Sequence, residues 1–391
     1  MNRIVYLLLL SSSLYACGEP NRTAPFMDAA AGDSAPASDS GSPDAPDAGP
    51  DDSGPAADGG TTTDSGMVDA GAMTCTRSSI VTDTFSIAAD FAVDGEALHV
   101  AYNKWGGVVS YRTRVGATWS PPGAAVAVEP GEITITVVAG VPWIAVTRTT
   151  ATTIYRLDAG AWTVEGTVAS QPDTYPVAIE SGLDADGAYR LAILRSESGM
   201  LRLTTFTPGA GESTPRTLTS DFDEVNMHFA SDGLLGVVWS TSTGAVGSFW
   251  DGPSRSPGAM GPITLPDGTT TGEVAINVER APEFLVSGDD GWSHVSGTSR
   301  NVIQPGSTST GLNPPRLVFG DDGARYAMTF AFNGSAGLET SLLTDRGGSW
   351  SEPQFFSGDA SAIHPLPGGG VAMVLVTGST GSKNLVLLEC D

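Results

Sequence analysis

The sequence has little positive charge: 19 Lys and Arg stand against 44 Asp and Glu, which gives its 391 residues a formal net charge of −25. Such acidity argues against nucleic acids and anionic lipid surfaces as partners, because both carry charge of the same sign. Lys and Leu, which favour helices, are sparse in the folded part, whereas Gly, Thr, Ser and Val are abundant. No apolar pattern of helical period extends for a useful length. The fold is therefore predicted to be all-β.

Residues that ligate metals or act as nucleophiles are also scarce. The four histidines lie far apart, and no His-Glu-x-x-His, Cys-x-x-Cys or EF-hand spacing occurs. We therefore expect no metal and no cofactor. A Gly-x-Ser-x-Gly elbow and a phosphate-binding Gly-x-x-x-x-Gly-Lys loop are missing from residues 75–391, so no catalytic residue is assigned. His99 lies inside an apolar run and is expected to be a core residue.

Residues 1–17 resemble a bacterial lipoprotein signal peptide. Arg3 supplies the positive start, and Ile4 to Leu10 form an apolar segment too short to span a bilayer. The segment from Leu14 to Cys17 resembles the lipobox, which implies that Cys17 is lipidated and begins the mature chain. Gly18 in place of Asp implies the outer membrane of a Gram-negative bacterium. An ordinary secretory signal cleaved nearby is the alternative.

Residues 18–74 are rich in Ala, Asp, Gly, Ser and Pro, and one Arg against eleven acids gives them a net charge of 1 − 11 = −10. Aromatic and β-branched residues are nearly absent, so this stretch cannot bury enough apolar surface to offset chain entropy. We predict a disordered acidic tether that holds the folded head, residues 75–391, away from the membrane.

The head contains an internal repeat, which is shown by the first turn of each unit. Successive turns are 45, 47, 46, 48, 42 and 46 residues apart. They fall at Asp94-Gly95, Ala139-Gly140, Asp186-Gly187, Asp232-Gly233, Arg280-Ala281, Asp322-Gly323 and Gly368-Gly369. Four short strands in each period of this length predict a seven-bladed β-propeller. The last unit has only three strands, so Ser79 to Thr84 is expected to supply its fourth and close the ring.

The turn between the third and fourth strands resembles the Asp-box of sialidases and other propellers. Asp345-x-Gly347-x-Ser349-Trp350 has the full frame, the copy at Arg114 has Arg in place of Asp, and the copy at Asp158 is one residue short. In such a turn the carboxylate bonds backbone N–H groups, Gly allows positive φ, and Trp packs between sheets. We therefore expect structural roles for Arg114, Gly116, Trp119, Asp158, Gly160, Trp162, Asp345, Gly347 and Trp350.

Sialidase activity does not follow from this resemblance. The family's Phe/Tyr-Arg-Ile-Pro motif is missing, and the arginines are scattered, with Arg112, Arg156 and Arg202 at similar places in three units. A glycosidase carboxylate pair among the many acids stays open. Three tryptophans outside the turn motif are candidates for stacking on a sugar: Trp105, Trp250 and Trp292.

Cys75 and Cys390 remain after Cys17 is assigned to the signal, and an even pair in an exported protein favours a disulfide. They are expected to meet where the seventh unit lacks its last hairpin. The sequence thus predicts a monomeric, membrane-anchored lipoprotein, on the surface or in the periplasm, whose head binds or scaffolds a protein or glycan ligand without catalysis. A sialidase-like or other glycosidase and a propeller lectin are the alternatives.

Overall fold

The chain divides into two compact units, Met1–Thr63 and Asp64–Asp391. All the residues that the computed structural model describes lie in the second unit: 73–84, 88–104, 108–127, 131–148, 150–170, 174–252, 260–279, 281–306, 314–333, 337–379 and 382–391. The predicted signal segment with Cys17 and nearly all of the predicted tether lie outside these ranges. Within them the regular elements are strands, and no helix has the length and hydropathy needed to cross a membrane.

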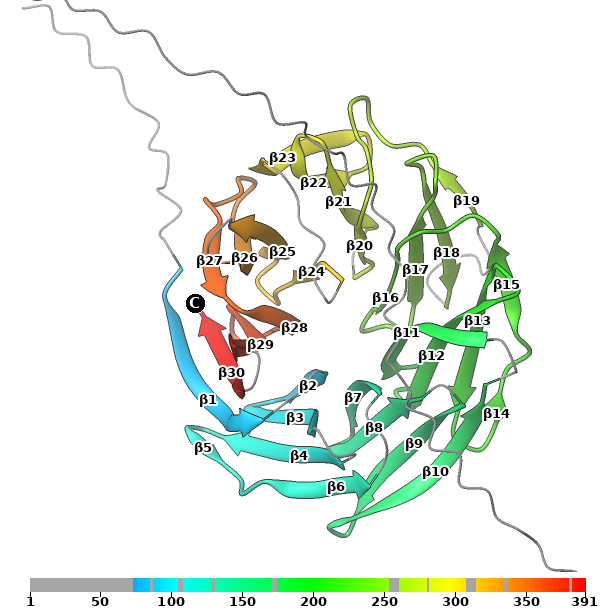
Figure 1. Ribbon diagram of the computed structural model, residues 1–391, viewed down its shortest axis with the longest axis vertical. Coiled ribbons are helices and arrows are strands. Elements are labelled where there is room, and N and C mark those ends of the chain that lie inside the picture. The colour runs from blue at the N-terminus through cyan, green and yellow to red at the C-terminus, as the bar shows by residue number, and fades with distance from the viewer. Residues whose placement is uncertain are drawn as a thin grey trace, which may run out of the picture. The chain divides into compact units, whose positions relative to one another are not determined.

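Seven antiparallel sheets of four or five strands stand in a ring, which confirms the predicted seven-bladed propeller (Figure 1). Blades 1 and 2 consist of β2 (Ala89–Asp94), β3 (Ala97–Lys104), β4 (Val108–Val115), β5 (Thr118–Trp119) and β6 (Gly123–Ala127), then β7 (Glu132–Val138), β8 (Val141–Thr147), β9 (Ala151–Asp158) and β10 (Ala161–Ala169). Blades 3 and 4 consist of β11 (Thr174–Leu183), β12 (Tyr189–Glu197), β13 (Met200–Thr207), β14 (Gly211–Glu212) and β15 (Arg216–Thr219), then β16 (Val225–Phe229), β17 (Leu235–Ser240), β18 (Val246–Asp251) and β19 (Met260–Ile263).

The remaining blades follow the same plan. Blades 5 and 6 consist of β20 (Val274–Asn277), β21 (Glu283–Gly288), β22 (Gly291–Ser296) and β23 (Ser299–Pro305), then β24 (Arg316–Phe319), β25 (Arg325–Asn333), β26 (Gly337–Asp345) and β27 (Gln354–Ser357). Blade 7 consists of β28 (Asp359–Pro365), β29 (Val371–Ser379), β30 (Ser382–Cys390) and, from the other end of the head, β1 (Cys75–Thr84).

The hydrophobic core is divided among the seams between adjacent blades. In β12, Leu191 and Ile193 pack with Ile154 of blade 2, whereas the alternate residues Ala192 and Leu194 belong to the cluster shared with blade 4. Successive residues of a strand point to opposite faces, so a sheet buried on both faces needs nearly continuous apolar runs. This explains the unbroken apolar runs inside the second strands of the repeat, such as Leu191 to Leu194 in β12 and Val237 to Trp239 in β17.

The first turn of the repeat has the same backbone geometry in several blades. A hydrogen bond joins residues three apart at Gly187 and Asp184 (3.0 Å), and the equivalent bond joins Gly233 and Ala230 (3.0 Å). Gly233 has a φ of 83°, and a Cβ on it would lie 2.4 Å from the backbone nitrogen of Ala185 in blade 3. Glycine is therefore required there for its left-handed backbone and for the close approach of the neighbouring blade.

The ring closes as predicted. Strand β1 pairs antiparallel with β30, and Cys75 is the register partner of Cys390. Their sulfur atoms are bonded at 2.08 Å, with the two Cα atoms 4.0 Å apart. The disulfide therefore joins the two ends of the propeller at the place where every complete blade has its last hairpin.

Candidate functional site

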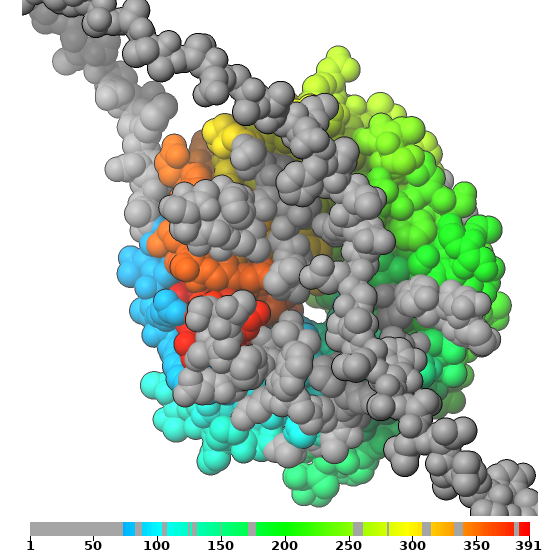
Figure 2. Space-filling model, viewed as in Figure 1, coloured from blue at the N-terminus to red at the C-terminus, as the bar shows by residue number. Residues whose placement is uncertain are grey.

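The central channel of the ring is lined by the inner strands β2, β7, β11, β16, β20, β24 and β28, which contact one another in succession. Figure 2 shows an opening through the middle of the ring. Ionisable side chains from six of these strands lie there, and all six are at least partly exposed. We call them the channel residues: Asp90, Glu132, Glu180, His228, Arg316 and His364.

Asp90 of β2 connects blade 1 to blade 2. Its carboxylate accepts hydrogen bonds from the backbone N–H of Phe91 (2.9 Å) and, across the seam, from that of Ile135 (2.9 Å). Burial raises the pKa of Asp90 to about 7, with a further rise from the charge of Glu180, although the two N–H groups and Arg316 act in the opposite direction. Near neutral pH this carboxyl group therefore exists in both protonation states.

Glu132 of β7 repeats this arrangement one blade further. Its Oε1 accepts a long hydrogen bond from the backbone N–H of Ile179 in blade 3 (3.4 Å). Glu132 faces the channel, yet the dense protein around it desolvates its carboxyl group, and this desolvation raises its pKa to about 7. The neighbouring charges of Glu180 and Asp90 raise it further, while Ile179 and Arg316 oppose the rise.

Arg316 of β24 reaches across the ring from blade 6. Its Nη1 donates to Oδ1 of Asn226 (3.2 Å) and to the carbonyl of Met227 (3.1 Å), both in blade 4. Its Nη2 lies 3.5 Å from Oε2 of Glu180 in blade 3. In return, the amide of Asn226 donates to the carbonyl of Pro315 (2.9 Å). Arg316 thus joins three blades and supplies a permanent positive charge among the channel acids.

The two histidines flank the acids along the ring, with His364 on blade 7 next to blade 1 and His228 on blade 4 next to blade 3. His364 of β28 meets the ring of Phe91 edge-on, with the centroids 4.7 Å apart. Burial lowers its pKa to about 3, with smaller electrostatic contributions from His228 and Arg316, so the imidazole of His364 is neutral at physiological pH. His228 lies 3.9 Å from Glu279; burial raises the pKa of that acid, but His228 and Ser231 outweigh it and lower the pKa overall.

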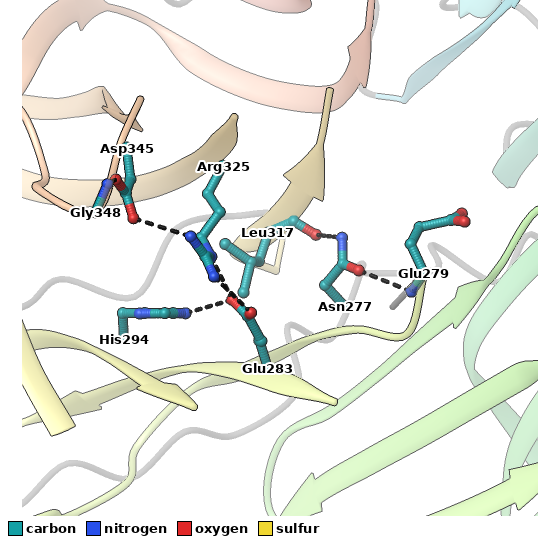
Figure 3. A network of polar contacts seen from close by, with 8 residues as sticks. All are labelled: Asn277, Glu279, Glu283, His294, Leu317, Arg325, Asp345 and Gly348. Atoms are coloured by element: carbon teal, nitrogen blue, oxygen red, sulfur yellow. Dashed lines mark hydrogen bonds and ion pairs between the residues drawn. The ribbon is translucent and has the colours of Figure 1, made fainter. Parts of the chain in front are cut away.

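A second polar network lies in the seam between blades 5 and 6 (Figure 3). Arg325 grips Glu283 with Nε (2.7 Å to Oε2) and Nη2 (3.0 Å to Oε1), and its Nη1 donates to Asp345 (3.1 Å). Glu283 also bonds His294 (2.6 Å), and Asp345 accepts the N–H of Gly348 (2.7 Å). Because the carboxylates are buried and each bonds other groups of the protein, the network serves to hold the two blades together.

The turn residues predicted from the Asp-box resemblance lie at the ends of third strands. In the turn at Asp345, the carboxylate Oδ1 accepts the backbone N–H of Gly348 (2.7 Å), and Gly347 has a φ of 100°. The turn at Arg114 differs, because this residue donates to Glu389 of blade 7 (Nη1 to Oε2, 2.6 Å). In the third copy, Asp158 is exposed beside Gly160, whose φ is 84°.

Two tryptophans of these turns contact an aromatic ring of the neighbouring blade, and the third contacts an arginine of its own blade. Trp162 meets Tyr111 of blade 1 edge-on (5.2 Å), and Trp350 contacts His294 of blade 5 in the same way (5.2 Å). Trp119 has the guanidinium of Arg112 over its ring, 5.6 Å from the centroid.

The expectation that Trp250 and Trp292 are available to stack on a sugar is wrong. Trp292 is 1% exposed and its indole N–H donates to the carbonyl of Phe330 (3.1 Å), and Trp250 is 8% exposed. Both lie on strands whose two faces are covered by neighbouring blades, so proximity to a turn does not bring them to the surface. Trp105 lies outside the described residues. His99 is a core residue, as predicted: it is 7% exposed and bonds the hydroxyl of Tyr111 (2.6 Å).

Sequence reasoning missed most of the channel residues. A usable signal was present, since Asp90 lies four residues before its aligned turn, as do His228 and His364, and Arg316 lies six before its own. A charged residue that interrupts a short apolar strand at such a position indicates a special environment. Within the described ranges, no three His, Cys, Asp or Glu side chains are placed to hold a metal ion.

The arginines are distributed around the ring. Arg114 pairs with Glu389 across the seam of blades 7 and 1, and Arg190 pairs with Asp251 across that of blades 3 and 4 (2.7 Å). Arg325 belongs to the seam of blades 5 and 6. These three guanidinium groups are therefore not gathered around a single substrate carboxylate, as a sialidase requires.

No protein-family model matches the sequence, and no curated protein matches it. Among solved structures, the chain is similar to the BP39L lectin from Burkholderia pseudomallei, at 16% identity and a TM-score of 0.49, over 76% of this chain and 97% of that chain. It is similar to AofleA from Arthrobotrys oligospora (13%, 0.45, 73% and 90%) and to the WD40 domain of SCAP from fission yeast (10%, 0.47, 81% and 98%). At these identities and TM-scores, no function carries over to this chain.

Proposed function

We propose that the protein is an exported, lipid-anchored binding protein whose propeller takes a polar, uncharged ligand at the central channel without chemical turnover. The observation that carries this proposal is that the six channel residues, from six inner strands, are close enough to act electrostatically on one another. Perturbed carboxyl groups that line a cleft are typical of functional sites. The lipobox at Cys17 supports anchoring in the outer membrane, and the acidic stretch 18–74 supports a tether for a monomeric head.

The chemistry of the channel favours a ligand rich in hydroxyl groups, such as a neutral glycan. Asp90, Glu132 and Glu180 offer hydrogen-bond acceptors on one side of the channel, and Arg316 brings donors next to Glu180. A hydroxyl group both donates and accepts, so a polyol suits both sides. An anionic ligand would meet three carboxyl groups and one guanidinium, which is unfavourable.

A glycan array tests this proposal with the full chain carrying Cys17→Ser, which keeps the protein free of lipid. We expect neutral glycans to be retained, and Arg316→Met to abolish retention. Arg190→Gln is the matched control, because it removes an arginine from a seam away from the channel. Equal retention by Arg316→Met and the unsubstituted channel would refute the channel as the site. The anchor is tested separately by intact mass and by membrane fractionation of the Cys17 and Cys17→Ser proteins.

A glycosidase is the second candidate, because the raised pKa of Asp90 and of Glu132 suits a general acid near neutral pH. Each carboxyl group is nevertheless bonded to a backbone N–H of the next blade, which suits a structural role equally well. Chromogenic glycosides distinguish the two. Hydrolysis that disappears in Asp90→Asn would establish catalysis, whereas binding without hydrolysis supports the first proposal.

A further inference from the structure

Arg195 of β12 is a buried arginine whose donors are mostly unmatched. The residue is 6% exposed, and in the described part of the chain no group accepts a hydrogen bond from its Nε or its Nη2. Its Nη1 lies 3.8 Å from Oε1 of Glu212, which is too far for a hydrogen bond. The Nε and Nη2 hydrogens point in the same direction, so one whole edge of the guanidinium group is unpaired.

The same edge of another arginine shows what it is suited to hold. In Arg325, Nε and Nη2 bond the two oxygens of Glu283 at 2.7 and 3.0 Å. This parallel pair of bonds is the usual way in which a guanidinium group recognises a carboxylate. Arg195 offers an identical edge, but the protein places no carboxylate against it.

A second arginine stands beside the first. Arg202 of β13 is the register partner of Arg195, so two positive side chains lie opposite each other on neighbouring strands, which destabilises a sheet. The Nε of Arg202 also lacks an acceptor among the described residues, while its Nη1 bonds Glu197 at 3.0 Å. On these two neighbouring strands, three guanidinium nitrogens therefore lack an acceptor: Nε and Nη2 of Arg195 and Nε of Arg202.

The surroundings make these unmatched donors costly. Arg195 follows Leu191 and Ile193 on the face of β12 that packs against Ile154 and Val168 of blade 2. Burial lowers the pKa of Arg195, and the charges of Glu212 and Glu197 oppose that change. A buried donor without an acceptor costs free energy that an arriving acceptor restores.

Access to Arg195 is through a rim of long, flexible side chains. Arg202, Glu197 and Glu212 have side-chain exposures of 32%, 29% and 38%, against 7% for Arg195 beneath them. Access for a ligand therefore requires these three side chains to rotate away from Arg195.

We propose that the seam between blades 2 and 3 binds the carboxylate group of a ligand on the Nε and Nη2 edge of Arg195, with Nε of Arg202 as a third donor. The ligand class is a small organic carboxylate, either a free acid or the uronic acid of a glycan. This site is separate from the central channel and does not depend on the function proposed for it.

Isothermal titration calorimetry of the full chain with Cys17→Ser tests this site, with glucuronate as the probe and glucose as its uncharged counterpart. Glucuronate should bind saturably at least ten times more tightly than glucose, and Arg195→Gln should remove that difference. Succinate is the further arm: if it binds as well as glucuronate, the carboxylate alone is recognised, and if it binds less well, the sugar contributes too.

Two variants keep the result interpretable. Arg190→Gln, in the same strand but paired with Asp251, should retain the affinity for glucuronate. Arg195→Lys keeps the charge but lacks the edge, so it should bind as weakly as Arg195→Gln, and it decides the question if the Gln variant does not fold. Equal affinity for glucuronate and glucose, or full affinity in Arg195→Lys, would overturn the proposal.

Discussion

Two seams of the propeller each contain an arginine with little or partial exposure, and they differ in whether its guanidinium donors are paired. Between blades 5 and 6, all three nitrogens of Arg325 bond carboxylates, which in turn bond His294 and a turn N–H. Between blades 2 and 3, Arg195 has no acceptor for the corresponding edge within the described chain. The two guanidinium groups have the same chemistry, so the difference lies in what the neighbouring blade offers.

This comparison separates two uses of charge in one fold. A buried ion pair stabilises a defined arrangement only when every donor and acceptor is matched, and an unmatched charge costs free energy. The seam between blades 5 and 6 meets that condition, so its charges stabilise the ring. The seam between blades 2 and 3 does not meet it, which is why we assign a ligand-binding role to Arg195.

The largest expected effect concerns the closure on which both seams depend. Replacing both cysteines, Cys75→Ser with Cys390→Ser, removes a link between residues 315 apart in sequence. The entropy model predicts a loss of about 5 kcal/mol in the free energy of unfolding. Denaturant unfolding of the disulfide-bonded protein measures it, with reduced wild-type protein as the control. An unchanged midpoint would contradict a stabilising role for the disulfide.

The second-largest effect is expected at the seam between blades 5 and 6. Glu283→Ala leaves Arg325 and His294 without their shared acceptor, and we expect a loss of about 3 kcal/mol. Asp251→Asn is the matched control, because the pair of Asp251 with Arg190 is more exposed and should cost at most about 1 kcal/mol. Thermal unfolding of the two variants checks both values. Similar losses in the two would show that the network is no stronger than a surface pair.

A smaller effect is the pH dependence of stability that arises from Asp90 in the channel. The folded-state pKa of Asp90, about 7, lies above its ordinary value of 3.8, so its contribution to stability is complete at low pH and is lost as the pH rises towards and through 7. Asp90→Asn removes this titration and keeps an acceptor for Ile135. The variant should therefore gain stability relative to wild type between pH 5 and 8, by about 1 kcal/mol after screening by channel solvent. A difference independent of pH would show that Asp90 titrates normally.

The smallest effect is expected at the seam between blades 2 and 3, where the donors of Arg195 are unpaired. Arg195→Met removes a buried charge and fills the same volume with an apolar side chain, so unfolding should change by less than about 1 kcal/mol, in either direction. Thermal unfolding alongside Glu283→Ala measures the contrast. A loss of stability as large as that of Glu283→Ala would mean that Arg195 holds the blades together, and it would contradict a ligand-binding role.

The ring itself was predictable from the sequence. Turns such as Asp232-Gly233 recur at a nearly constant interval because each blade needs the same tight connection, and the incomplete last unit pointed to closure through Cys75 and Cys390. These signals are local or periodic, so they can be recognised in one sequence without an alignment.

The candidate sites could not be predicted in the same way. The pairs of Arg114 with Glu389 and of Arg316 with Glu180 join residues far apart in sequence, and their meeting depends on how the blades curve. The burial of Trp292 was misjudged for a related reason, since both faces of its strand are covered. Arg195 gave a weak signal, as a charge at the end of an apolar run.

The contrast between the two arginines can be observed directly by NMR of protein labelled with nitrogen-15 arginine. The Nε–H resonances of Arg195 and Arg325 are assigned from the Arg195→Lys and Arg325→Lys spectra and followed during a glucuronate titration. We predict that the Arg195 resonance shifts and becomes protected from solvent exchange, while that of Arg325 stays in place. An Arg195 resonance that does not respond at saturating glucuronate would contradict the assignment of this seam to a ligand.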